Sequence, residues 1–208
     1  MDLGIDLYHL GHASFRINSE KIIYIDPFEL KDDSVKADLI LITHSHYDHC
    51  SIKDIQRIVK PGTEIFIPPD CQSKLNHLEG VKITLVHPNK SYSFGSIRVD
   101  TIPAYNPSKR FHPRENDWLG YIITVGGKRL YHAGDTDFIP EMKSLKNIDI
   151  ALLPVGGTYT MDVDEAAAAV NSLKPKFFVP MHYHVSGLSA DLKRLESKVD
   201  KSVKLVVL

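Results

Sequence analysis

The stretch Thr43-His44-Ser45-His46-Tyr47-Asp48-His49 decides the fold of this chain. It follows directly on Leu39-Ile40-Leu41-Ile42, a short uncharged run that predicts a buried strand. A strand delivers the chain to the edge of a sheet, where an irregular turn can direct several side chains at one point. Because imidazoles and carboxylates are ligands of Zn²⁺ and similar ions, the turn predicts a site that holds two ions side by side. The alternative is a polar surface loop that is rich in histidine.

Further short motifs lie before and after this stretch in a recognisable series. The pattern His44-x-His46-x-Asp48-His49 resembles the signature of the metallo-β-lactamase superfamily. Four other landmarks stand in the order expected for its small metal-dependent hydrolase branch, which includes ascorbate-lactonase-like and N-acylphosphatidylethanolamine-phospholipase-like proteins: Gly11-His12-Ala13-Ser14, Asp26-Pro27, Gly134-Asp135-Thr136 and Pro180-Met181-His182-Tyr183. The resemblance covers essentially the whole chain. It implies an α+β fold, a four-layer αββα sandwich with metal ions at one edge between the two sheets.

Length and composition agree with one compact domain over residues 1–208. Hydrophobic residues make up 43% of the chain, charged residues 25%, and the net charge is −1. This balance gives no strong nucleic-acid signal, and no apolar run approaches the roughly 18 residues of a membrane span. The N-terminal residues lack the pattern of a signal peptide, so we expect a cytoplasmic protein with a small-molecule substrate. A homo-oligomer is left open.

The hydrophobic pattern alternates strands and helices. Expected strands cover residues 7–17, 21–25, 64–67, 81–86, 92–102, 119–125, 128–132, 149–153, 176–179 and 203–207. Expected helices begin at Ser51, lie around 70–78, run from Asp162 to Pro175, and cover 191–199. Ser51 and Asp162 are the residues expected to cap their helices.

Two more residues follow predicted strands and extend the ligand set. Asp135 comes after Gly134, and His182 comes after an apolar run; alone, these would be a turn cap and a packed histidine. The resemblance implies that His44 and His46 serve the first ion and that Asp135 bridges to the second. It assigns the second ion to Asp48, His49 and His182. Asp26 either fixes a ligand imidazole by a hydrogen bond or caps a strand end.

The first ion lacks one ligand in this sequence. The superfamily usually supplies a third histidine from a central loop, where this chain has Tyr105-Asn106. Asn106 through its carbonyl oxygen, His112, or His12 could fill the place, or only one ion is held firmly. The expected cofactor is therefore one or two divalent metal ions, with Zn²⁺ first and Mn²⁺, Fe²⁺ or Ni²⁺ as alternatives.

The residues favour a metal-dependent hydrolase, in which metal-activated hydroxide attacks an ester, lactone, amide or phosphodiester bond. Asp48 and His184 are the candidate catalytic residues, the latter facing the substrate or lying exposed in a loop. The basic loop 109–114 either receives a phosphate or carboxylate or is simply solvated. Cys50 is expected to be a small buried residue turned away from the ions. The alternatives are a non-catalytic metal- or ligand-binding protein on the same fold and a phosphodiesterase or nuclease.

Overall fold

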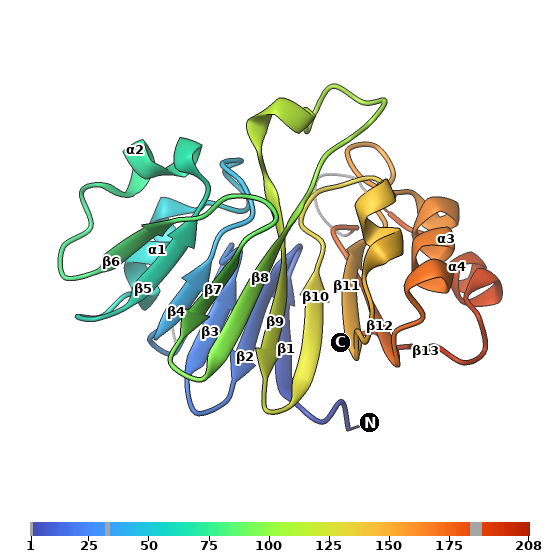
Figure 1. Cartoon of the computed structure of the whole chain (residues 1–208), viewed down its shortest axis with the longest axis horizontal. Helices are drawn as coiled ribbons and strands as arrows, with labels where there is room; N and C mark the ends of the chain where they lie inside the picture. The colour runs from blue at the N-terminus through green and yellow to red at the C-terminus, as the bar shows by residue number, and fades with distance from the viewer. Residues whose placement is uncertain (1, 32–33, 184–188) are drawn as a thin grey trace.

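The structure, a computed structural model, describes residues 2–31, 34–183 and 189–208, and these form two β-sheets packed face to face (Figure 1). The first sheet has the order β1 (Asp6–Gly11), β2 (Ser14–Asn18), β3 (Ile22–Ile25), β4 (Leu39–Leu41), β5 (Glu64–Ile67), β6 (Lys82–Leu85). The second has the order β13 (Lys204–Leu205), β12 (Phe177–Met181), β11 (Ile150–Pro154), β10 (Lys128–His132), β9 (Leu119–Val125), β8 (Ile97–Pro103), β7 (Ser91–Phe94). Each sheet starts as an antiparallel meander and continues with parallel strands.

Successive side chains along each strand point to opposite faces of the sheet, and this explains why the two sheets pack against each other. On β2, Phe15 and Ile17 point into the cluster between the sheets, as Ile23 and Ile25 do on β3. Tyr24, the residue between the last two, points to the opposite face and packs under helices. Side chains two residues apart share a face of a strand, so both faces of this sheet are buried.

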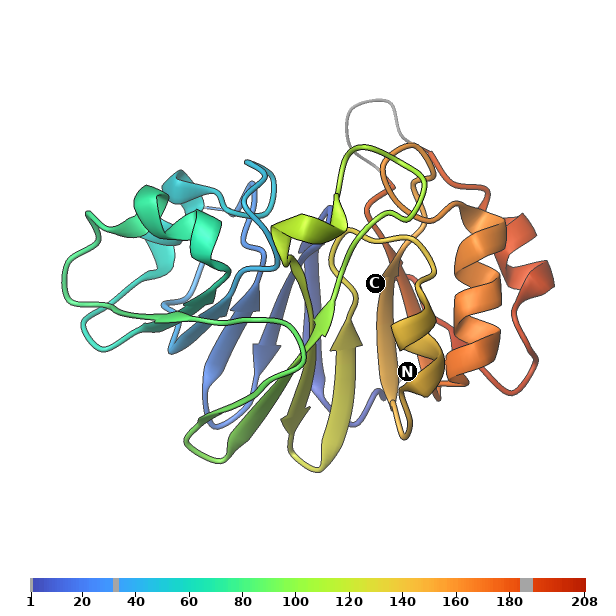
Figure 2. The same ribbon diagram turned by 45° about the horizontal axis from the view of Figure 1, so that its top comes forward.

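Helices cover the outer face of each sheet (Figure 2). The first sheet is covered by α1 (Ile52–Ile58), η1 (Pro69–Cys71) and α2 (Gln72–Leu75). The second is covered by η3 (Pro140–Ser144), α3 (Val163–Leu173) and α4 (Leu192–Lys198), while η2 (Arg114–Asn116) lies in the loop between β8 and β9. The layers run helix, sheet, sheet, helix, which confirms the predicted αββα fold class. No helix in the described ranges is long and apolar enough to cross a membrane.

The two predicted caps are confirmed. The Ser51 hydroxyl accepts a hydrogen bond from the Asp54 N–H (3.4 Å), and the Asp162 carboxylate accepts one from the Glu165 N–H (2.8 Å). Side-chain oxygens at these positions satisfy N–H groups that the first helical turn leaves unpaired. Ser51 therefore begins a helix immediately after the histidine motif, and this limits the conformational freedom of the motif.

Two predicted strands are wrong because each is a hairpin. Residues 7–17 form β1 and β2, and the chain turns after Gly11, whose φ is +116°. Residues 92–102 form β7 and β8, which turn at Gly95 with φ +59°. In residues 7–17 the apolar positions keep the same parity across the turn, which hides the break, whereas in 92–102 they shift from 92 and 94 to 97 and 99, a signal of the turn at Gly95. The first hairpin matters for the site, because its turn carries His12.

The segments that carry the predicted ligands meet at one edge of the sandwich, the upper edge in Figure 1. The histidine motif follows β4, the Gly134-Asp135 turn follows β10, and His182 follows β12. Neighbouring parallel strands end at the same edge of a sheet, so their following turns converge. The loop between β8 and β9, residues 104–118, reaches the same edge.

Candidate metal centre

Three groups of ligand-type side chains lie at this edge; two of them share no residue, and the third, Asp26, His44 and His49, takes one histidine from each of these. The first group consists of His44, His46 and His112. The second group consists of His12, Asp48, His49 and His182. Within each group, one ligand-type atom from every residue lies within 4.8 Å of the others. Each group thus offers at least three donors to one ion, the number that tight zinc sites take from protein.

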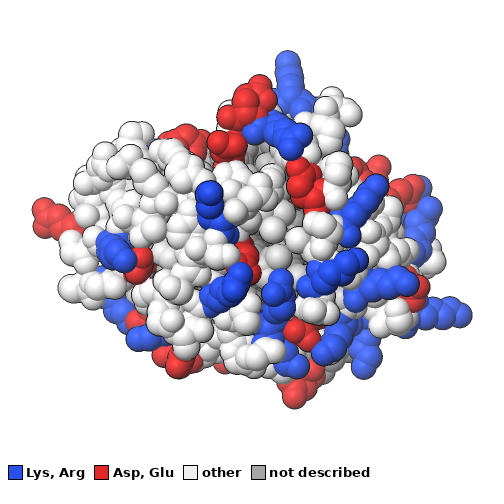
Figure 3. All heavy atoms as spheres, viewed as in Figure 1, with Lys and Arg blue, Asp and Glu red and all other residues white. Residues whose placement is uncertain are grey.

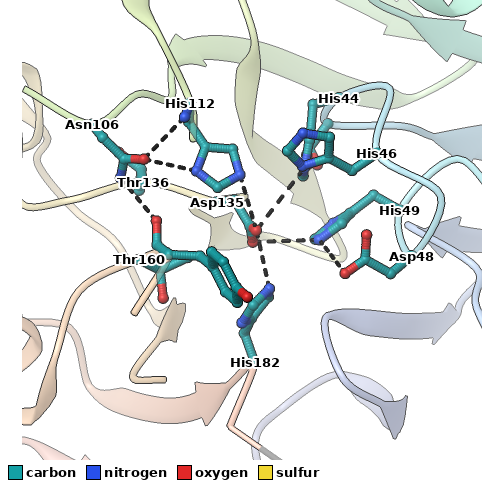
Figure 4. Close-up of polar contacts among 12 residues, drawn as sticks. His44, His46, Asp48, His49, Asn106, His112, Asp135, Thr136, Thr160 and His182 are labelled. Atoms are coloured by element: carbon teal, nitrogen blue, oxygen red, sulfur yellow. Dashed lines mark hydrogen bonds and ion pairs between the residues drawn. The ribbon is translucent and has the colours of Figure 1, made fainter. Parts of the chain in front are cut away.

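Asp135 lies between the two groups (Figure 4). Its Oδ2 is 3.3 Å from Nε2 of His112 in the first group and 3.0 Å from Nε2 of His182 in the second. Its Oδ1 is 3.4 Å from Nε2 of His49. One carboxylate therefore faces both groups, which is the geometry that a bridging ligand needs.

Buried atoms without hydrogen-bond partners test whether the site fits a metal ion. His49 Nε2, His112 Nε2 and Asp135 Oδ1 are all buried and have no hydrogen-bond partner in the described structure. Buried polar atoms are otherwise satisfied almost everywhere in proteins, because an unpaired one costs free energy. These three converge on one space, and a divalent cation between them would satisfy all three. The donor set therefore fits the predicted ions.

Asp26 orients histidines of both groups. Its Oδ2 lies 2.7 Å from Nδ1 of His49, and both carboxylate oxygens accept hydrogen bonds from Thr43. The Thr43 hydroxyl in turn lies 2.9 Å from Nδ1 of His44. Hydrogen bonds at Nδ1 orient these imidazoles; Nε2 of His49 is left without a hydrogen-bond partner, and Nε2 of His44 lies 3.0 Å from Nδ1 of His46. The predicted hydrogen bond between the Asp26 carboxylate and an imidazole of the motif is present, with His49 as the donor.

Among the three alternatives for the missing third histidine, His112 is the one that lies with His44 and His46. Asn106 Oδ1 accepts hydrogen bonds from the His112 backbone N–H (3.0 Å) and ring Nδ1 (2.8 Å), so that oxygen faces the histidine (Figure 4). The Asn106 amide nitrogen donates to the Tyr159 carbonyl at 3.0 Å. Asn106 thus holds His112 in place, and the expectation that it could itself serve as a ligand is wrong for this arrangement.

His12 joins the second group and not the first. Its Nε2 lies 3.0 Å from Asp48 Oδ2, and its carbonyl accepts a hydrogen bond from the His182 N–H at 3.0 Å. His12 and His182 have φ angles of +50° and +59°, in the left-handed region that non-glycine residues rarely adopt. Such strained residues persist where the surroundings hold them, and they gather at functional sites.

The environment favours the ion-binding protonation states of His44, His46 and Asp48, whereas at His49 the carboxylates of Asp135 and Asp26 outweigh burial and raise the pKa well above its ordinary value. Burial lowers the pKa of His44 well below its ordinary value, and it lowers the pKa of His46 as well. These imidazoles are therefore neutral at neutral pH. Although burial opposes it, the hydrogen bond to His12 lowers the pKa of Asp48 to about 2, so this group is a carboxylate. Neutral imidazoles and ionised carboxylates are the ligand forms that metals take.

Of the two residues that position Asp135, Gly134 was part of a predicted motif, whereas His132 had no signal in the sequence. His132, at the end of β10, accepts a hydrogen bond at Nδ1 from the Gly134 N–H (3.2 Å), and its Nε2 lies 2.9 Å from the Ala13 carbonyl. Gly134 has φ +65°, and a Cβ there would lie 2.6 Å from the Leu119 carbonyl oxygen. A single buried histidine in a strand looks like any core residue, so only the tertiary contacts reveal it.

The remaining predictions have mixed outcomes. Cys50 is buried at 3% exposure in the apolar cluster under α1, as expected. His184 lies outside the described residues. In the basic loop, Lys109 pairs with Asp137 and Arg114 with Glu141, so these two cations are already neutralised by protein carboxylates.

Comparisons with known proteins agree with the fold and the family resemblance. Residues 6–182 match the family described as the beta-lactamase superfamily domain. A UPF0173 metal-dependent hydrolase of Thermoplasma acidophilum is 35% identical over 198 residues, covering 90% of this chain and 87% of that protein. A crystal structure of a Parabacteroides distasonis protein has a TM-score of 0.88 at 35% identity, covering 98% of this chain and 92% of that one. Igni18, a metallo hydrolase of Ignicoccus hospitalis, has a TM-score of 0.81 at 28% identity, covering 98% and 94%. The predicted resemblance is confirmed: this chain belongs to the beta-lactamase superfamily and, within it, to the family of UPF0173 metal-dependent hydrolases.

Proposed function

We propose that this protein holds two divalent metal ions and hydrolyses an ester, lactone, amide or phosphodiester bond of a small molecule. The observation that carries the proposal is the convergence of buried, unpartnered ligand atoms from both groups on Asp135. In a packed core, such unpaired polar atoms cost free energy, whereas in a metal centre they bind the ions.

The proposed ligands divide between the ions as the two groups do. His44, His46 and His112 would hold the first ion. Asp48, His49 and His182 would hold the second, with Asp135 between the ions. The many imidazole donors favour Zn²⁺, and Mn²⁺, Fe²⁺ and Ni²⁺ are the alternatives for the test below.

The ions, when bound, would lower the pKa of a coordinated water and polarise the oxygen of the bond to be cleaved. The protein contributes orientation. Asp48 lines the pocket beside the ions, and His12 fixes its Oδ2, so this carboxylate would orient the attacking water. Asp26 and Asn106 would hold His49 and His112 at fixed angles.

Elemental analysis followed by turnover assays tests the proposal. Protein stripped with a chelator is reloaded with each metal and assayed on matched panels of esters, lactones, amides and phosphodiesters. We expect hydrolysis that is lost on stripping and lost in His46→Ala, while His87→Ala, an exposed histidine outside both groups, keeps the activity. Tight metal binding without turnover on any panel would instead support a non-catalytic metal-binding protein.

A further inference from the structure

The pocket above the two groups has an aromatic wall that the proposed chemistry does not use. The pocket has a volume of about 250 Å³, and its lining includes Tyr47, Phe111 and Tyr159 beside the proposed ligands. Tyr47 is 69% exposed and Tyr159 39% exposed. Exposed aromatic rings gathered at one concave site typically mark a place where a ligand binds.

The aromatic wall is held in place by polar contacts behind it. Phe111 and Tyr159 meet edge to face, with ring centroids 4.7 Å apart and an interplanar angle of 83°. Asn106 binds the Tyr159 carbonyl, and Lys109 binds the Thr160 carbonyl at 2.6 Å, so two loops are tied together behind the rings. A wall fixed in this way loses little conformational entropy when a ligand packs on it.

Cationic side chains are missing from the pocket lining in the described part of the chain. Lys109 is neutralised by Asp137 at 2.5 Å, and Arg114 pairs with Glu141 at 3.0 Å. Arg110 is exposed, and its guanidinium carbon lies 5.8 Å from the Phe111 ring centroid. A substrate with further anionic groups would find no lysine or arginine in the lining to bind them.

The molecular surface leads to the same conclusion on the face that Figure 3 shows. Lys and Arg side chains there gather mainly on the right-hand half and have Asp and Glu side chains interspersed among them (Figure 3). The net charge of the chain is −1. A long anionic polymer would need a continuous cationic path, and this face does not offer one.

We propose that the substrate is neutral away from its scissile bond and carries one apolar group of the size of a single ring, which packs on Phe111 and Tyr159. This proposal rests on the proposed function. A cavity of roughly 150 Å³ holds a benzene molecule, so this pocket takes one ring and the reacting group beside it. The substrate class is then an ester, lactone or amide with an aryl or similar apolar substituent, and not a nucleic acid.

Binding of metal-chelating probes tests this proposal without turnover. Acetohydroxamate and phenylacetohydroxamate share the chelating group and differ by the ring, and their dissociation constants are measured by calorimetry on the metal-loaded protein. We expect the phenyl probe to bind at least about tenfold more tightly, because ring burial is favourable. Phe111→Ala and Tyr159→Ala should each abolish most of that ratio. Tyr8→Ala is the matched control, since Tyr8 is 40% exposed and lies outside the pocket.

A third probe, 4-carboxyphenylacetohydroxamate, tests the charge. We expect it to bind no more tightly than the phenyl probe. Tighter binding that is lost in Arg110→Ala would overturn the proposal and show that Arg110 receives an anion. Equal affinity of the two uncharged probes would also overturn it, whereas failure of every turnover panel would count against the proposed function alone.

Discussion

The histidine motif, residues 43–50, and the loop 104–118 both supply proposed ligands, but they fix them in different ways. In the motif, four such residues lie within six consecutive positions between β4 and α1, so local chain geometry sets their directions. The loop supplies only His112, whose ring donates a hydrogen bond to the side-chain oxygen of Asn106 in the same loop. Dense local spacing can be read from a sequence, whereas a single histidine in a long loop depends on contacts that the sequence does not display.

The largest expected effect comes from the motif. Asp48→Asn keeps the shape of the side chain but removes the charge that we propose orients water beside the ions. We expect the fold to remain and kcat on the best substrate to fall by roughly 10²–10⁴-fold. Steady-state kinetics on variant protein with measured metal content checks this. An unchanged rate in the metal-loaded variant would show that another group orients the water.

Loss of the carboxylate that holds the motif histidines should weaken the binding of both ions together. Asp26→Asn replaces a fully buried carboxylate that serves His49 directly and His44 through Thr43. We expect the chelator-treated variant to lose about 3 kcal/mol of unfolding free energy, because the buried imidazole of His49, whose pKa is raised, is left without the Asp26 carboxylate. Urea denaturation and metal titration together measure the result. Weakening of only one ion would contradict the shared support.

Loss of the side-chain oxygen that holds His112 should weaken the binding of one ion alone. Asn106→Ala removes the acceptor for Nδ1 of His112, and we expect the affinity for one ion to fall by about 10–100-fold while the other is unchanged. Asn106→Asp keeps an acceptor oxygen there and should recover most of the affinity. Titration calorimetry on the three proteins separates the two ions. Equal weakening of both ions would remove the distinction between the two regions.

The smallest expected effect concerns the ion pair between Lys109 and Asp137, which anchors the loop 104–118. Lys109→Met breaks a pair with Asp137 whose side chains are 28% and 7% exposed, and we expect a loss of about 1 kcal/mol in urea denaturation. Lys82→Met is the matched control, because Lys82 pairs with Glu64 at 71% side-chain exposure and should change stability by less than about 0.5 kcal/mol. A loss of similar size in both variants would mean that the loop is not held through Lys109.

The same contrast explains which parts of the fold could be predicted. The strand before His44 and the caps at Ser51 and Asp162 follow from short-range rules, and all are confirmed. The hairpin at Gly11 was missed because alternation continues through its turn, whereas the hairpin at Gly95 carries a change in the parity of the apolar positions that the prediction overlooked. Among the site residues, His132 and Asn106 were not recognised as positioning residues, since each acts through a partner that the fold brings near.

Metal stoichiometry of the native protein and of His112→Ala tests the central claim most directly. Both proteins are loaded with Zn²⁺, dialysed against a weak chelator and measured by elemental analysis, with His87→Ala as the control. The proposed two-ion centre predicts two ions per chain in the native protein and in the control, and one ion in His112→Ala. Two ions retained by His112→Ala, or a single ion in the native protein, would contradict it.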